Sequence, residues 1–157
     1  MKEKILEAFR DLGFKLEEEE GMGYSFNYEG LNLLYMYNEN DEEFLNIALP
    51  GIVEVEEGRM LQICALLEKI NSTLKYVKAY ILGNSVWLFY ERELFGEEDL
   101  MTVISRMILH LEAGLAFVRK AMTEIEETMA GNSSDDNDAD GSEEIVAEEI
   151  VDDDDKE

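Results

Sequence analysis

Residues 70–95 read INSTLKYVKAYILGNSVWLFYERELF, and this stretch decides the fold. Its first half alternates apolar and polar side chains, and its second half is a nearly continuous apolar run, as β-strands often are. Between them lie Gly83 and Asn84, a dipeptide suited to a two-residue turn. The stretch therefore predicts an antiparallel hairpin. Its second strand is apolar on both faces, with Trp87 and Phe89 on one of them.

The residues before this hairpin predict one helix and a β-meander. Apolar side chains from Ile5 to Leu12 recur at helical spacing, and Gly13 stands where a helix commonly ends. Four segments with strand-like composition follow, separated by turn residues. They span residues 14–20, 24–28, 31–37 and 44–49. Pro50 and Gly51 are expected to end the last of these strands.

A second helix is expected between the meander and the hairpin. From Glu56 onward the apolar residues change from strand spacing to intervals of three and four. They are Met60, Ile63, Cys64, Leu67, Ile70 and Leu74. This spacing predicts about four helical turns with one apolar stripe. Because Cys64 belongs to the stripe, we expect its thiol to lie in the core.

A third helix is predicted from about Glu97 to Thr128. At 1.5 Å per residue it would be about 45 Å long, which exceeds the width of a small domain. We therefore expect either a break near Gly114 or an end that leaves the domain. Its middle is apolar nearly all round, which is typical of a helix buried on two sides. One face would pack on the sheet and the other on a second subunit.

Together these elements predict an α+β fold, an antiparallel β-sheet with helices in the order α-β-β-β(-β)-α-β-β-α. The segments LGFKLEEEE at 12–20, FNYEGLNLLYMYNENDEEFLNIALP at 26–50 and the hairpin resemble the YbjN-type family of bacterial proteins. That family has a type III secretion chaperone-like fold and is described as sensory transduction regulators. The resemblance covers residues 1–126, within a single expected domain of residues 1–130. It implies a small acidic homodimer that binds another protein, and it supplies no catalytic residues.

The charge of the chain restricts its partners. The formal net charge is −25, with 38 acidic and 13 basic residues. Residues 1–130 hold 25 acids and 12 bases, and residues 131–157 hold 13 acids and one base. Such a surface repels phosphates, so we expect neither nucleic acid nor a membrane as a partner. No secretory signal or long apolar span is evident and there is one cysteine, so a cytoplasmic location is expected.

Residues 131–157 are expected to be a disordered acidic tail, because few apolar residues offset the entropy of the chain. Its DNDADG segment matches the first half of a calcium loop, with Asp136, Asp138 and Asp140 at positions one, three and five. Position twelve would be Ala147 instead of the required glutamate, so no metal site is predicted. Two EEIV copies, at residues 143 and 148, could dock on a sheet edge as a strand.

Candidate catalytic residues lack the partners that their chemistry needs. His110 is the only histidine and Cys64 the only cysteine, and they lie on different predicted helices. The acidic run at 17–20 reads as a solvated surface. No phosphate loop, nucleophile elbow or HExxH motif occurs. We therefore expect a non-enzymatic protein without a cofactor or metal.

Two functional hypotheses follow. In the first, the protein binds a polypeptide partner of unknown identity through its sheet and forms a homodimer through the last helix. The predicted partner-binding residues are Tyr35, Tyr37, Trp87 and Phe89. The predicted dimer residues are Leu109, Ala113, Ala116 and Phe117. In the second hypothesis, the protein is a sensor that binds a small molecule or a divalent ion through the tail or a cavity of the sheet.

Overall fold

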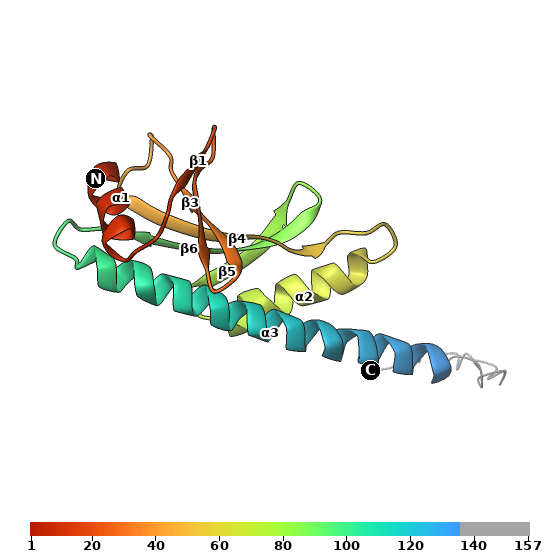
Figure 1. Cartoon of the computed structure of the whole chain (residues 1–157). Helices are drawn as coiled ribbons and strands as arrows, with labels where there is room; N and C mark the ends of the chain where they lie inside the picture. The colour runs from red at the N-terminus through yellow and green to blue at the C-terminus, as the bar shows by residue number, and fades with distance from the viewer. Residues whose placement is uncertain (136–157) are drawn as a thin grey trace, which may run out of the picture.

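A computed structural model describes residues 1–135 of the chain. The order of elements is α-β-β-β-β-α-β-β-α, as the sequence predicts (Figure 1). The elements are α1 (Lys2–Asp11), β1 (Glu17–Glu19), β2 (Gly23–Tyr28), β3 (Leu31–Met36), β4 (Phe44–Glu54), α2 (Met60–Thr73), β5 (Val77–Leu82), β6 (Ser85–Glu93) and α3 (Leu100–Asp135).

The six strands form one antiparallel sheet in the order β1-β2-β3-β4-β6-β5. The predicted hairpin is confirmed, with Leu82 paired to Ser85 across the turn. Gly83 has a φ of +65°, and Asn84 is not among the residues with positive φ, as in a turn whose first central residue is glycine. The helices lie on one side of the sheet, so the domain has two layers (Figure 1).

The core lies between the sheet and the helices. Inward side chains of β3, β4 and β6 meet the apolar faces of the three helices in one cluster. Phe9 of α1 is fully buried against Phe26 and Tyr35, with ring centroids 4.9 and 5.6 Å away. Burial of such aromatic side chains is among the largest stabilising contributions in a domain of this size.

Strand β4 does not end at Pro50 as the sequence predicts. It continues to Glu54, and its pairing with β6 shifts register between Leu49 and Val53. Pro50 and Gly51 lie within this irregularity, where Gly51 has a φ of +62°. A bulge tolerates proline because the missing N–H takes no part in the ladder there. The prediction that the strand ends at Pro50 was therefore wrong, because a bulge accommodates Pro50 and Gly51 within the strand.

Strand β1 is shorter than the segment 14–20 predicted from the sequence. Only Glu17–Glu19 pair with β2. Phe14 and Leu16 precede the strand and pack against the core as part of the connection from α1. Apolar residues at a strand-like spacing therefore contribute to packing here without joining the ladder.

The last helix is unbroken, so the break near Gly114, one of the two predicted alternatives, is absent. The other alternative is the one observed, because the C-terminal end of the helix extends past the sheet (Figure 1). Gly114 is buried, and a β-carbon there would lie 3.3 Å from Leu88 Cδ1. The glycine therefore lets α3 pass close to the sheet. The helix continues to Asp135, beyond the predicted end at Thr128, because adding a turn to an existing helix requires no new nucleus.

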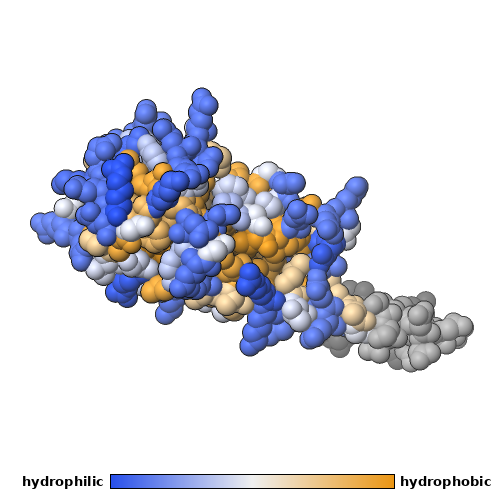
Figure 2. All heavy atoms as spheres, in the orientation of Figure 1, coloured by the Kyte–Doolittle hydropathy of each residue, from blue (hydrophilic) through white to orange (hydrophobic). Residues whose placement is uncertain are grey.

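The C-terminal half of α3 extends past the sheet beside α2 (Figure 1). Two ion pairs join these helices, Arg59 with Glu126 and Lys69 with Glu124. The helical residues 100–132 are long and apolar enough to cross a membrane, because one window of 18 residues within them has a mean hydropathy of 1.4. However, 44% of that window is buried inside the domain. A core helix passes the same test. Figure 2 shows apolar side chains gathered over the middle of the domain, with polar residues around them.

Candidate functional site

The side of the sheet opposite the helices, here called the open face, carries apolar and aromatic side chains. Successive residues of a strand point to opposite faces, so the open-face residues alternate with those of the core. They are Leu34, Met36, Asn46, Ala48, Lys78, Tyr80, Trp87, Phe89 and Glu91. Leu34, Ala48 and Phe89, with Met36 and Trp87 against them, form a cluster separate from the main core. Within residues 1–135, no helix belongs to this cluster.

The register of the strands aligns these residues in rows across the sheet. Leu34 pairs with Ala48, Ala48 with Phe89, and Phe89 with Lys78. A second row runs from Met36 through Asn46 to Glu91. Side chains that lie directly opposite on adjacent strands are close enough to contact one another. The open face therefore has an apolar row beside a more polar one.

An aromatic stack covers one end of the apolar row. The rings of Tyr80 and Phe89 are nearly parallel, with centroids 4.0 Å apart. Trp87 lies on the other side of Phe89, with centroids 6.0 Å apart, and its indole N–H donates to Ser85 Oγ at 3.1 Å. Phe89 is fully buried beneath its neighbours, while Tyr80 is 39% exposed. Tyr80 and Trp87 therefore form the part of the stack that solvent or a partner can reach.

The polar row is held by charged contacts. Asn46 Nδ2 donates to Glu91 Oε1 at 2.8 Å, and Lys78 Nζ donates to the other Glu91 carboxylate oxygen. Burial raises the pKa of Tyr80, nearby Glu91 raises it further, and Lys78 opposes them, so the hydroxyl stays neutral at physiological pH. Asn46 Oδ1 is buried without a hydrogen-bond partner in the part of the chain described.

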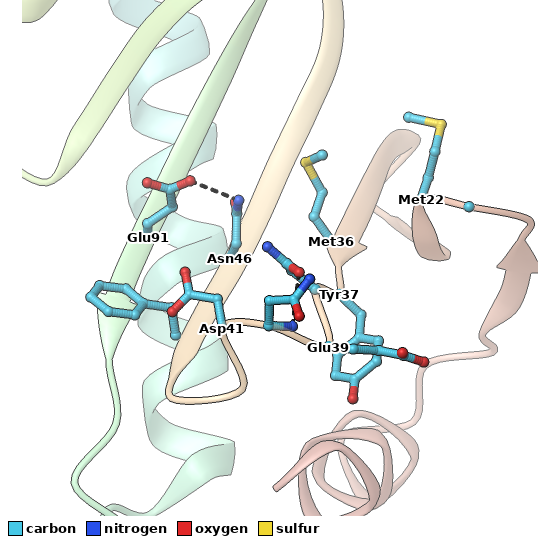
Figure 3. Close-up of a pocket in the computed structure, with 11 residues that line it drawn as sticks. Met22, Met36, Tyr37, Glu39, Asp41, Asn46 and Glu91 are labelled. Atoms are coloured by element: carbon cyan, nitrogen blue, oxygen red, sulfur yellow. Dashed lines mark hydrogen bonds between the residues drawn. The ribbon is translucent and has the colours of Figure 1, made fainter.

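A hollow of about 600 Å³ opens beside the polar row (Figure 3). The loop that joins β3 to β4 forms one wall, and α3 passes behind the sheet on the far side (Figure 3). Its lining combines methionine and phenylalanine with acids and amides. The lining residues are Gly21, Met22, Met36, Tyr37, Asn38, Glu39, Asn40, Asp41, Phe44, Asn46 and Glu91. An acidic rim around apolar side chains favours a ligand that is both cationic and apolar.

The two edges of the sheet differ in their access to a partner. Strand β1 is short and consists of three glutamates, which discourage pairing with another strand. Strand β5 is longer, but Asn71 of α2 covers its outer edge. Asn71 Nδ2 donates to the carbonyl of Ala79 at 2.9 Å, and the amide of Ala79 donates to Asn71 Oδ1 at 2.8 Å. The asparagine therefore occupies the place of a neighbouring strand at one residue of this edge.

The four predicted partner-binding residues are divided between the two faces. Trp87 and Phe89 lie on the open face. Tyr35 is only 1% exposed and packs against Phe9 in the core, so its prediction as a surface residue was wrong. Burial strongly raises the pKa of Tyr35. Tyr37 follows two residues later on the same inward face, and its hydroxyl donates to Glu42 at 2.6 Å.

The four predicted dimer residues share the outward side of α3. Leu109 is 52% exposed, Ala113 and Ala116 are exposed, and Phe117 is partly buried against the core. A shallow apolar hollow of about 280 Å³ lies beside Leu109, between α1 and α3. The prediction that this stripe binds a second subunit stays a prediction.

The two residues considered as catalytic candidates lie in different surroundings. Cys64 is exposed, so the prediction of a core thiol was wrong. The buried arc of α2 consists of Ile63, Leu66 and Ile70, and Cys64 lies about 100° around the helix from Ile63. His110 is half-buried beside the rings of Tyr76 and Tyr90, which stack on each other.

Among residues 1–135, no group of three metal-ligating side chains is present. The DNDADG segment and both EEIV copies lie outside the described residues, as does most of the predicted tail. Residues 131–135, which the sequence assigns to that tail, are helical.

The open face also contains residues that the sequence analysis did not select. They are Tyr80, Met36, Asn46 and Glu91. Asn71, at the outer edge of β5, was not selected either. Alternation along β5 could have identified Tyr80, since it separates Tyr80 from the apolar Ala79 and Ile81. No local pattern identifies Asn71, because its function depends on a strand that follows it in the chain.

Comparison with solved structures supports the fold. The chain is similar to YbjN from E. coli, a proposed transcription regulator, with a TM-score of 0.58 and 16% identity, covering 84% of this chain and 93% of that one. The fold is YbjN-like. An uncharacterized protein from Methanothermobacter thermautotrophicus is also similar, with a TM-score of 0.52 and 16% identity, over 81% of this chain and 97% of that one. No family model and no curated protein matches the chain. The YbjN-type resemblance seen in the sequence is thus confirmed for the fold.

Proposed function

We propose that this protein is a non-enzymatic binding module that holds a segment of another polypeptide on the open face. The observation that carries the proposal is the aromatic stack of Tyr80, Phe89 and Trp87 on a sheet face that no helix covers within residues 1–135. Protein interfaces are enriched in such aromatic residues at their centres. The YbjN-like fold supports a regulator or chaperone type of module over an enzyme.

The chemistry around the stack defines the kind of segment that would fit. Glu91, Glu39 and Asp41 surround the hollow next to Met36 and Phe44. Complementary charge at a rim increases specificity and the association rate. We therefore expect a segment that places an aliphatic or aromatic side chain on the stack and a lysine or arginine in the hollow. The carboxylates of Glu39, Asp41 and Glu91 would pair with that cationic group.

Site-specific photo-crosslinking tests this proposal. Tyr80 is replaced by p-benzoylphenylalanine in the full chain, which is then irradiated in an extract of the cells from which the gene comes. The matched control carries the same residue at Leu61, which is 71% exposed on α2. The proposal expects crosslinks from position 80 to a segment with apolar and basic residues, and their loss when Trp87 is replaced by Asp. Equal crosslinking from positions 61 and 80, or crosslinking from 61 alone, would contradict it.

We further propose that the protein dimerises through the outward stripe of α3 and acts in the cytoplasm. Leu109, Ala113 and Ala116 expose apolar surface, and the hollow beside Leu109 could receive a side chain of the second copy. The exposed thiol of Cys64 suits a reducing compartment. Light scattering after size-exclusion chromatography should give twice the chain mass of 18.0 kDa. Leu109→Glu should halve that mass while Arg119→Glu, off the stripe, should not. A monomeric full chain would reject the dimer.

A further inference from the structure

A further hollow, here called the basic pocket, is lined by basic side chains, although the chain as a whole is acidic. It has a volume of about 250 Å³ and lies where the end of β6 and the first turns of α3 meet the start of β5. Its lining residues are Tyr76, Tyr90, Arg92, Thr102, Val103, Arg106 and His110. Two are arginines, one is the single histidine and none is acidic. In a chain with 38 acids and 13 bases, this concentration of donors needs an explanation.

The arginines of the pocket are only partly neutralised. Arg106 forms no ion pair with any residue from 1 to 135. Arg92 has one, with Glu98 at 3.6 Å. Both guanidinium groups act on the same hydroxyl, since burial raises the pKa of Tyr90 while Arg92 and Arg106 oppose that rise. Both arginines line the same hollow as that hydroxyl's residue.

The backbone of Tyr76 has an unusual conformation that burial of its side chain does not explain. Tyr76 has a φ of +67°, and it is one of two non-glycine residues with positive φ in the described part of the chain. The amide of Val77 donates to the carbonyl of Lys75 at 2.8 Å, which closes a tight γ-turn centred on Tyr76. Such turns are rare and strained, and strained residues cluster at binding sites. Because Tyr76 is 66% exposed, burial does not account for the strain.

The turn gives Tyr76 a specific place in the pocket. Its ring is stacked on that of Tyr90, with centroids 5.5 Å apart and planes 4° apart. Both rings contact His110, with centroid separations of 5.3 and 5.7 Å. Hydroxyl, imidazole and guanidinium donors are thus arranged around one small volume. This set matches an oxyanion, since guanidinium groups bind carboxylates through two parallel hydrogen bonds.

We propose that the basic pocket binds carboxylate side chains of an acidic polypeptide segment, with Arg106 as the principal contact and Arg92 and His110 beside it. The volume of about 250 Å³ suits one or two acidic side chains. The site is separate from the open face and does not depend on the function proposed for that face.

Two sources can supply the carboxylates. One is an acidic segment of another protein, and the other is residues 136–157 of this chain, which hold twelve acids and one lysine. From His110 to Asp135 the helix spans about 38 Å at 1.5 Å per residue. Twenty-two residues can extend about 75 Å, so this segment is long enough to return to the pocket.

The single histidine supplies a direct measurement of occupancy. The proton resonance of His110 Cε1 is followed in the full chain and in a full-length variant whose acids in 136–157 are replaced by Asn and Gln. A synthetic peptide of residues 136–157 is then titrated into that variant. The proposal expects a saturable shift of the resonance on titration. Arg106→Gln in the same variant should weaken peptide binding about tenfold or more, the loss expected when a charged hydrogen-bond donor is removed. Arg119→Gln, an exposed base elsewhere on α3, should bind the peptide unchanged.

The two sources give different results before any peptide is added. If the chain's own segment occupies the pocket, neutralising its acids alone moves the His110 resonance. If it does not, the resonance stays in place and only the added peptide shifts it. The proposal is overturned if the peptide causes no saturable shift, or if Arg106→Gln leaves the titration unchanged while the spectrum shows a folded domain.

Discussion

The two faces of the sheet have similar apolar composition and different coverage. On the helix face, Leu88 and Tyr90 of β6 lie in a continuous core beneath α3. On the open face, Trp87 and Phe89 of the same strand belong to a small cluster to which no helix of residues 1–135 contributes, and the ring of Tyr80 stacks on Phe89. Adjacent residues of one strand therefore face different surroundings. The helix face stabilises the fold, and the open face presents apolar surface that no helix within residues 1–135 covers.

The largest effect should come from truncating the helix face. Leu88→Ala removes a fully buried side chain beneath Gly114 and should lower the free energy of unfolding by about 2–5 kcal/mol. Its matched variant on the open face is Tyr80→Ala, which removes one stacked ring and should cost about 1 kcal/mol. Urea unfolding curves measure both. Equal losses would mean that the two faces do not differ as described.

The next effect concerns the close approach of α3 to the helix face. A β-carbon at Gly114 would lie 3.3 Å from Leu88 Cδ1 and 3.5 Å from Val77 Cγ1. Gly114→Leu should therefore overpack the contact and cost about 1–3 kcal/mol, measured by the same unfolding curves. A β-carbon at Gly131 on the same helix would lie within 4 Å of no neighbouring atom in residues 1–135, so Gly131→Leu should not destabilise the protein. A stable Gly114→Leu variant would show that α3 can move away from the sheet.

A smaller loss is expected at the edge that separates the two faces. Asn71→Ala removes both hydrogen bonds to the backbone of Ala79 and should cost about 1–2 kcal/mol, because water can reach part of this edge. It should also promote self-association through β5, detected as a rise in mass by light scattering. Ser72→Ala is the control, since its hydroxyl makes only a long contact with Lys69 at 3.4 Å. Unchanged stability and mass would show that Asn71 does not protect the edge.

The smallest effect depends on pH and concerns the start of α3. Asp99 accepts hydrogen bonds from the hydroxyl of Thr102 at 2.7 Å and from its amide at 3.4 Å, and these bonds lower the pKa of Asp99 from its ordinary value of 3.8. A carboxyl group with a lowered folded pKa contributes stability above its unfolded pKa. That stability is lost as pH falls through the lower folded value.

Unfolding curves between about pH 5 and pH 2 measure this contribution. Asp99→Asn should lose stability less steeply than the parent chain as pH falls. Parallel curves for Asp99→Asn and the parent would contradict the assignment.

The element order could be predicted because the apolar residues recur at regular strand or helix spacing. The hairpin, the meander and the helix containing Ile63 and Ile70 were read from spacing alone. The errors arose where tertiary packing overrides local signals. Pro50 lies in a bulge within β4 and does not end the strand. At Gly114, where a break was one of two alternatives, the glycine instead allows close contact with the sheet.

The candidate site was predicted less completely than the fold. Alternation placed Trp87 and Phe89 on one face, but it could not show which face the helices cover. Tyr35 was therefore assigned to a surface when it belongs to the core. The basic pocket could not be predicted from the sequence either, since Arg92, Arg106 and Tyr76 come together only when β5, β6 and α3 pack.

Solvent access to Trp87 tests the central claim most directly, because it is the only tryptophan and lies on the open face. Acrylamide quenching of its fluorescence is measured in the full chain, with and without the partner identified by crosslinking. We predict that the partner lowers the quenching constant of Trp87. The control is a variant that combines Trp87→Phe with Leu61→Trp on α2. The partner should leave the quenching constant of the tryptophan at position 61 unchanged. Unchanged quenching at position 87 with protection at position 61 would contradict the account.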